Sequence, residues 1–192
     1  MKFLDTILGR TKPKPANLDA LFAVPGAAIT LEAAMGLTSA GSAAVCFKPA
    51  SAYDFASTCT EIGQLLELSG KDTGSQVSQS EDSYGYHWIV IRDPDVSDLV
   101  TTVHMVNSTL AERGYGNQLL ASVFAFRGES GGVSYLVYLF KRGTFYPFVP
   151  EPGGGEKRDN QRELQLQGAL QGEVPLEAEL SRWFPIWGIP VP

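Results

Sequence analysis

LLASVFAFRGESGGVSYLVYLFKRGTFYPF, residues 119–148, is the stretch of the sequence that decides the fold. Two runs rich in β-branched and aromatic residues, LLASVFAF and VSYLVYLFKR, flank GESGG, which has the length and composition of a hairpin loop. Gly143 then breaks the second run, and Pro147 cannot donate a hydrogen bond to a β-ladder. We therefore expect Phe145, Pro147 and Phe148 to finish a buried strand and turn it outward.

Further strands are expected upstream of this hairpin. YGYHWIVIR (84–92) is apolar on both faces, which is typical of a strand inside a sheet. AAITLEAAMGLTSAGSAAVCFKP (27–49) is ambiguous, and we interpret it as two strands joined around Gly36 to Gly41, the second covering Ala43 to Lys48. The polar stretch 71–83 is expected to be a loop that contains a short edge strand.

Helices are expected where capping residues precede apolar stripes. The longer ones are Ser51 to Ser69, Ser97 to Arg113 ended by Gly114, and a helix from Asn160 to Leu170 with Asn160 and Glu163 at capping-box spacing. Shorter helical segments are expected between Asn17 and Pro25 and from Pro175 onward. The terminal SRWFPIWGIPVP (181–192) is expected to pack back across the domain as a clasp; the alternative is an exposed apolar patch that needs a partner. These elements predict a single α+β domain over 17–192, with a mostly antiparallel sheet of about four to six strands covered by helices.

Composition and charge limit the class of protein. The 192 residues carry a net charge of −6, which argues against nucleic-acid binding because phosphate neutralisation needs a basic surface. The two cysteines have no CxxC spacing and indicate buried side chains in a reducing compartment. No apolar run approaches the roughly 20 residues that cross a bilayer, and no signal peptide is evident. We expect a cytoplasmic protein.

We expect residues 1–16 to form a separate basic amphipathic arm. Four cations and one carboxylate give the arm a charge of +3, so the remainder of the chain carries −9. The apolar residues of MKFLDTILGR fall in one helical sector, and TKPKP follows as a stiff linker. The arm suits a partner or an anionic membrane surface, where each cation contributes about 1 kcal/mol; a helix docked on its own domain, or a frayed terminus, is the alternative. The candidate docking residues are Phe3, Leu4, Ile7, Leu8, Lys12 and Lys14.

A second candidate surface consists of Lys141, Arg142 and Tyr146. The two cations suit a carboxylate or phosphate, and an aromatic side chain beside arginine is typical of an interface. The alternative is that the aromatic side chains of this segment fill the core while the cations project from a strand end.

Catalytic and cofactor motifs are missing from the sequence. No phosphate loop, dinucleotide fingerprint, serine-nucleophile motif or tight metal-ligand spacing occurs, so we expect no cofactor, no metal and no enzyme activity. The alternative that stays open is a small-ligand-sensing domain or an enzyme, with a pocket between the sheet and the helices near His87, His104 and Arg142.

Several segments, spread over nearly the whole chain, resemble the PspA-associated PspAB family of actinobacteria. They are MKFLDTILGR, NLDALFAVP, AAITLEAA, AVCFK, DSYGYHWIV, VHMVNSTL, VYLFKRGTFYPFVP, RDNQRELQL and LSRWFPIWG. The resemblance implies association with phage shock protein A, a peripheral membrane protein of the envelope-stress response, in a setting that includes a membrane metalloprotease. It implies no catalytic residues. We therefore expect a non-enzymatic accessory protein that binds a protein partner, with its arm at the inner face of the membrane.

Overall fold

The computed structural model describes residues 17–48, 60, 63–64, 75–129, 131–153 and 155–192. Their framework is a six-stranded sheet in the order β2-β3-β1-β4-β5-β6, and every ladder is antiparallel. This architecture confirms the expected α+β domain. The strands are β1 (Leu37–Phe47), β2 (Gln76–Glu81), β3 (His87–Arg92), β4 (Leu119–Gly128), β5 (Val133–Leu139) and β6 (Thr144–Phe148).

The quoted stretch forms the three strands at one edge of the sheet. β4 and β5 make the predicted hairpin, with Val123 opposite Val137. The prediction that Phe145, Pro147 and Phe148 lie in a buried strand is confirmed, but the prediction that they turn the chain outward is wrong. Gly143 adopts a left-handed conformation (φ 67°) and donates its N–H to Leu139 O at 2.8 Å, so the chain reverses and β6 pairs with β5. Because β6 is the last strand in the sheet order, it tolerates the missing N–H of Pro147.

The segment before β1 corrects a second expectation. Residues Val24–Met35 form helix α2, not a strand, and they follow directly on the 3₁₀ turn η1 (Leu18–Ala23). Pro25 lies in the first turn of α2, where its missing N–H leaves no helical hydrogen bond unmade. Gly36 ends the helix in the left-handed conformation, and the chain enters β1 at Leu37. The Asn17 side chain makes no capping bond to η1.

Two further helices are close to their expected positions. α4 (Val96–Leu110) is capped by Asp95, whose carboxylate accepts the Ser97 N–H at 2.7 Å, and a wider π-type turn, η2 (Ala111–Tyr115), follows it. α5 (Asn160–Ala169) is capped by Asp159 rather than by Asn160. The expected helix from Pro175 is replaced by an extended segment and the short 3₁₀ turn η3 (Leu180–Arg182). The predicted helix Ser51 to Ser69 lies largely outside the described residues.

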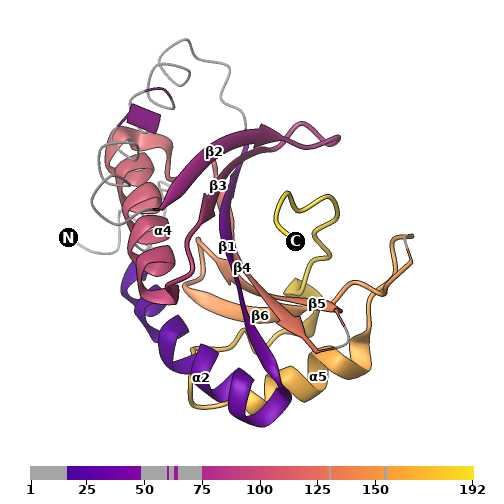
Figure 1. Cartoon of the computed structure of the whole chain (residues 1–192). Coiled ribbons are helices and arrows are strands. Elements are labelled where there is room, and N and C mark those ends of the chain that lie inside the picture. Colours follow the sequence, from indigo (N-terminus) through magenta and orange to yellow (C-terminus); the bar gives the residue numbers. More distant parts are fainter. Residues whose placement is uncertain (1–16, 49–59, 61–62, 65–74, 130, 154) are drawn as a thin grey trace, which may run out of the picture.

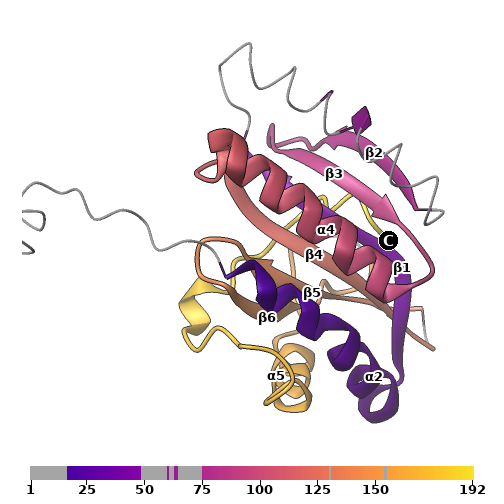
Figure 2. The ribbon, with the colours of Figure 1, turned by 90° about the vertical axis from the view of Figure 1, so that its left-hand side faces the viewer.

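The sheet carries a different layer on each face. Figures 1 and 2 show α2 and α4 along one face, with α5 at the lower end of the same side, and the C-terminal segment on the opposite, inner face. The first core lies under the helices and includes Leu31, Ile91 and Val103. The second core joins the inner face to the C-terminal segment through Trp88, Val123, Trp183 and Val191. The expected clasp is therefore observed.

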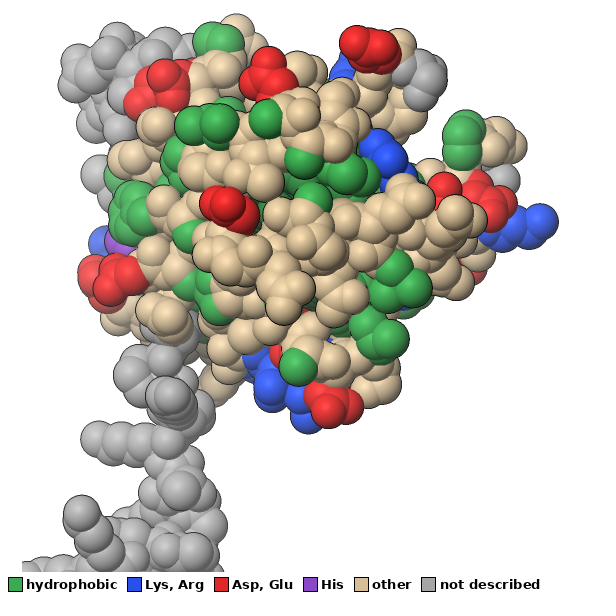
Figure 3. Space-filling model, turned by 90° about the horizontal axis from the view of Figure 1, so that it is seen from below, with side chains coloured by type: hydrophobic (Ala, Val, Ile, Leu, Met, Phe, Trp, Pro, Cys, Tyr) green, Lys and Arg blue, Asp and Glu red, His purple; other side chains and the backbone are tan. Residues whose placement is uncertain are grey.

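The helical stretch Leu18–Met35 is long and apolar enough to cross a membrane by length and composition alone. Core helices of soluble proteins meet the same criterion, and Leu21, Val24 and Leu31 of this stretch are buried in the first core. Its outer side exposes Phe22 and Ile29. Figure 3 views the end where α2 and α5 lie, and the apolar side chains there are interspersed with polar atoms and charges.

Candidate binding pocket

A pocket of about 580 Å³ opens on the inner face of the sheet. Its floor is formed by side chains that project from the strands, among them Cys46, Trp88, Ala121 and Tyr146. The turn between β2 and β3 closes one end, and the C-terminal segment Phe184 to Trp187 forms a wall. The volume lies within the range of small-molecule sites, and the lining is predominantly apolar and aromatic, as in most such sites.

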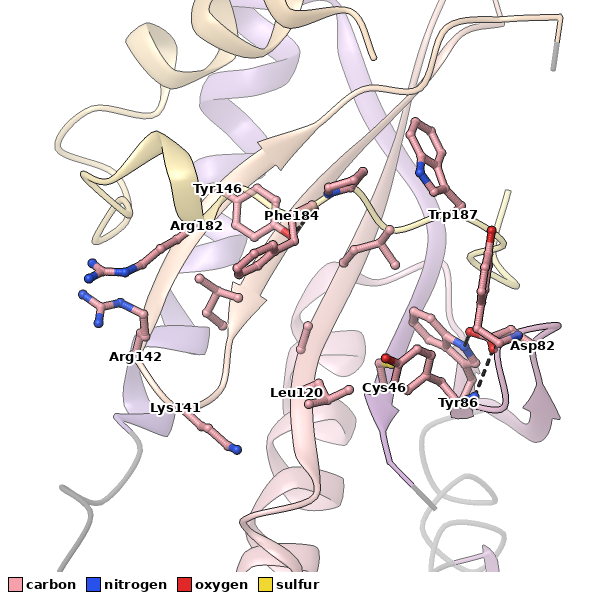
Figure 4. A pocket seen from close by; sticks show the side chains of 16 residues that line it. Cys46, Asp82, Tyr86, Leu120, Lys141, Arg142, Tyr146, Arg182, Phe184 and Trp187 are labelled. Carbon is pink, nitrogen blue, oxygen red and sulfur yellow. Dashed lines mark hydrogen bonds between the residues drawn. The ribbon is translucent and has the colours of Figure 1, made fainter. Parts of the chain in front are cut away.

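The two ends of the pocket differ in charge. In Figure 4, Lys141, Arg142 and Arg182 lie at one end, whereas Asp82 and Trp187 lie at the other. Leu120 lies between the two ends in Figure 4, and Ile186 is among the other apolar side chains of the lining. The site therefore offers an apolar surface with a cationic end.

Glu177 organises the cationic end. Its carboxylate accepts hydrogen bonds from Arg142 Nε, from Thr144 Oγ1 at 3.0 Å and from Arg182 Nη1 at 3.3 Å, and also from the backbone N–H of Glu179 at 3.1 Å. Its own N–H donates to Phe145 O at 2.7 Å, which fixes it beside β6. The Glu177 side chain is 2% exposed, whereas those of Arg142 and Arg182 are 45% and 42% exposed. A buried carboxylate thus holds two half-exposed guanidinium groups.

The pKa of Glu177 reflects this environment. Burial alone would raise the pKa, because it disfavours the charged form. The hydrogen bonds from Glu179, Arg142 and Thr144, together with the charge of Arg142, outweigh burial and hold the pKa of Glu177 below its ordinary value. Glu177 is therefore ionised at neutral pH and anchors the two arginines.

Asp82 organises the opposite end. Its Oδ1 accepts the backbone N–H groups of Tyr84 at 2.9 Å and Tyr86 at 3.0 Å, and its Oδ2 accepts Trp88 Nε1 at 2.9 Å. The Tyr84 hydroxyl in turn donates to Glu156 at 2.7 Å. Because N–H donors engage both oxygens of Asp82, its main role is to fix the β2–β3 turn and the indole of Trp88.

The C-terminal wall is held by hydroxyl and indole donors. Tyr146 Oη donates to Phe184 O at 2.8 Å, and Trp183 Nε1 donates to Glu177 O at 3.0 Å. Further along, Tyr135 Oη donates to Val191 O at 2.9 Å. Burial raises the pKa of Tyr146 far above its ordinary value, so its hydroxyl stays protonated and remains a donor.

Cys46 is the one thiol among the described residues that line the pocket, and it is poorly suited to nucleophilic chemistry. Burial, with a smaller contribution from the charge of Asp82, raises the pKa of Cys46 to about 12. The reactive thiolate is therefore scarce at neutral pH. Among the described residues, no group of three His, Cys, Asp or Glu side chains is placed to hold a metal ion.

The structure brings together one of the two predicted surfaces. Lys141, Arg142 and Tyr146 all line the pocket, but in different ways. Lys141 is exposed and Arg142 is paired with Glu177, whereas Tyr146 is buried beneath the C-terminal wall. Phe145 and Phe148 are also buried. The arm residues Phe3, Leu4, Ile7, Leu8, Lys12 and Lys14 lie outside the described part of the chain.

The two histidines do not belong to this pocket. His87 stacks on Phe47 of the helix-side core with 5.7 Å between ring centroids, and His104 of α4 lies 4.9 Å from Phe22. The alternative prediction was therefore right that a pocket lies beside Arg142. It was wrong to place the pocket between the sheet and the helices, and wrong to place His87 and His104 in it.

Sequence reasoning missed Asp82, Glu177 and the pocket wall at Phe184. Glu177 lies 35 residues from Arg142 along the chain, so no short sequence pattern predicts that the two side chains pair. The polar D-S-Y-G turn before β3 was the available signal for Asp82, because aspartate commonly accepts hydrogen bonds from the backbone two residues on.

Fold and pocket together define a class: a single-domain α+β protein with a mainly apolar pocket on the sheet face opposite its helices. The family model described as PspAB, PspA associated protein B, matches residues 1–191, and the chain belongs to this family. No curated protein and no solved structure matches the chain. The family description supports an accessory role associated with PspA.

Proposed function

We propose that this chain is a non-enzymatic accessory protein of a phage-shock-type envelope-stress system, and that it acts by binding a protein partner. The observation that carries the proposal is its membership, over residues 1–191, of the family described as PspA associated protein B. PspA is therefore the first partner to test. A membrane protease of the same system is the second.

The proposed place of action is the cytoplasmic side of the membrane, where the protein is peripheral. The charge distribution supports this proposal, because residues 1–16 carry +3 within a chain of −6. A basic segment is attracted to anionic lipid headgroups, and the acidic remainder is repelled by them. The arm would therefore contact the surface while the domain stays in solution.

Binding between purified proteins tests the partner. Calorimetric titration of PspA with the intact chain should show saturable binding, and a variant lacking residues 1–16 separates a contribution of the arm from that of the domain. PspA is ruled out as the direct partner if the intact chain does not bind it in this titration and the two proteins do not co-purify from native cells.

Liposome co-sedimentation tests the arm independently. Vesicles containing phosphatidylglycerol should retain the intact chain and release it as salt rises, since the Debye length shortens to about 8 Å at physiological ionic strength. A variant with Lys12→Glu and Lys14→Glu should lose this retention, and Lys48→Glu with Lys157→Glu is the matched control. Equal retention of both double variants would contradict a membrane role for the arm.

The pocket favours a second candidate, a small-ligand-binding or ligand-sensing domain. Its volume of about 580 Å³ and its apolar lining are typical of a ligand site. In this ligand-binding candidate, Arg142 lies at the rim of the pocket, and His87 and His104 lie outside it.

A further inference from the structure

We propose that the pocket binds a single-chain amphiphile with an anionic head group, such as a fatty acid or an anionic lysolipid. The tail would lie on the inner face of the sheet, and the head would lie at Lys141, Arg142 and Arg182. This inference rests on the second proposed function, ligand binding, and does not depend on the association with PspA.

The apolar surface of the pocket suits a hydrocarbon tail. Leu120, Leu139 and Ile186 line it, with Leu120 between the two ends in Figure 4, over a floor that includes Cys46 and Ala121. Cys46 acts here as a small apolar surface because its thiol is un-ionised at neutral pH. A tail bound here removes apolar area from water on both partners, which is the main source of affinity for such ligands.

The cationic end suits an anionic head. Three cations and the carboxylate of Glu177 leave this end with a net charge of +2. Lys141 is exposed, and it makes no hydrogen bond or ion pair with any residue that the structure describes. Arg142 uses Nε and Arg182 uses Nη1 to hold Glu177, so each guanidinium keeps further N–H donors for a carboxylate or a phosphate.

The opposite end does not suit a cationic head. Among the described residues of the lining, Asp82 supplies the only carboxylate, and three N–H donors already engage its two oxygens. A cation placed there would compete with the bonds that fix the β2–β3 turn. The polarity of the pocket therefore selects the sign of the head group, and the apolar stretch between the ends selects an extended chain.

Three amphiphiles with the same tail test the sign of the head. Isothermal titration of the full chain with dodecanoate, dodecyl maltoside and dodecyltrimethylammonium, each below its micellar concentration, should give one site for dodecanoate. The neutral and cationic compounds should bind about tenfold more weakly or worse, a difference of roughly 1.4 kcal/mol. Lysophosphatidylglycerol, compared with dodecanoate, distinguishes a lysolipid from a free fatty acid as the preferred source of the anionic head.

Variants locate the head and the tail. Lys141→Glu should weaken dodecanoate binding about tenfold while leaving dodecyl maltoside binding unchanged. Ile186→Gln should weaken both. Arg127→Glu, an equal charge reversal at an exposed position of β4 outside the pocket lining, is the matched control. Thermal unfolding of each variant shows whether the fold is kept.

The outcomes separate the proposals. Equal affinity for the three head groups, or equal effects of Lys141→Glu and Arg127→Glu, would overturn the anionic ligand and leave a ligand pocket of another kind. If none of the amphiphiles binds, both the inference and the ligand-binding candidate fail, whereas the titration with PspA decides the accessory role separately.

Discussion

Arg142 and Glu177 form an ion pair across 35 residues of sequence, and this pair joins the β5–β6 turn to the segment that follows α5. The carboxylate is buried while the guanidinium is half exposed. Glu177 therefore holds the edge strand β6 through its backbone and holds Arg142 and Arg182, two of the three cations at the pocket rim, through its carboxylate.

Glu177→Gln should destabilise the domain by about 1–3 kcal/mol, since a charged acceptor is lost and its donors are left without a full partner. Denaturant unfolding at pH 7 measures the change. Glu151→Gln, at an exposed position, is the control and should change stability little.

The contribution of Glu177 should also depend on pH. Its folded-state pKa is lower than its ordinary value of 4.5, so the unfolded chain takes up a proton more readily than the folded one. The stability is fully present above the unfolded pKa and is lost as the pH falls through the lower folded pKa. Unfolding curves of the native chain and Glu177→Gln should thus differ by a constant amount at neutral pH and converge below 4.5. A gap that persists unchanged at low pH would show that the carboxylate charge is not responsible.

Asp82→Asn should loosen the β2–β3 turn. The amide keeps one acceptor oxygen, so the N–H groups of Tyr84, Tyr86 and Trp88 cannot all remain bonded, at a cost of about 1–2 kcal/mol. Hydrogen exchange should accelerate at the amides of Tyr84 and Tyr86. Ser83→Ala in the same turn is the matched control, and equal exchange in the two variants would argue against the proposed role.

Cys46 should react very slowly with iodoacetamide. With a pKa of about 12, only about one thiol in 10⁴ is ionised at pH 8, and burial hinders access further. A Cys59→Ser background leaves Cys46 as the sole thiol, and mass spectrometry follows its alkylation. Unfolding in guanidinium should speed the reaction by orders of magnitude; fast alkylation in native buffer would contradict the burial of this thiol.

Tyr146→Phe should release the C-terminal wall locally. The change removes the hydrogen bond to Phe184 O and costs about 1 kcal/mol. Hydrogen exchange should rise in residues 184–191. Tyr138→Phe is the matched control, since its hydroxyl donates to Asn17 O at the start of η1, and exchange should rise there instead.

Gly143→Ala should destabilise the β5–β6 turn by about 1–3 kcal/mol, because a residue with a side chain strains in the left-handed conformation. The added Cβ would also lie 2.9 Å from Asn17 Cβ. Gly132→Ala, at a position with open space and no left-handed backbone, should change the denaturation midpoint far less.

The sequence predicted the elements with strong local signals. The run of residues that is apolar on both faces of β3 and the GESGG loop between β4 and β5 are such signals, and the structure confirms both the strand β3 and the β4–β5 hairpin. It failed at α2, where alanines and the β-branched Ile29 and Thr30 blur the difference between helix and strand. In the structure, the buried residues Val24, Ala27 and Leu31 recur every three or four positions, which is a helical spacing. This spacing is not evident from the sequence, because apolar residues also occupy most of the positions between them.

The pocket was predictable only in fragments. Lys141, Arg142 and Tyr146 were recognised because three unusual residues lie close together in sequence, and all three line it. The partners that shape it, Asp82 and Glu177, come from segments that are distant along the chain, and their pairing is a property of the tertiary fold. Tyr146 was predicted to be a docking side chain on the surface, but it is buried and donates a hydrogen bond to Phe184 O.

The two faces of the sheet are closed at different times as the chain is made. On one face, α2 precedes every strand and α4 precedes the β4–β5 hairpin, so most of that core is available early in synthesis. On the other face, Trp183 to Val191 follow all six strands. An apolar sheet face with Trp88 and Tyr146 therefore stays uncovered until residues 183–191 have been made.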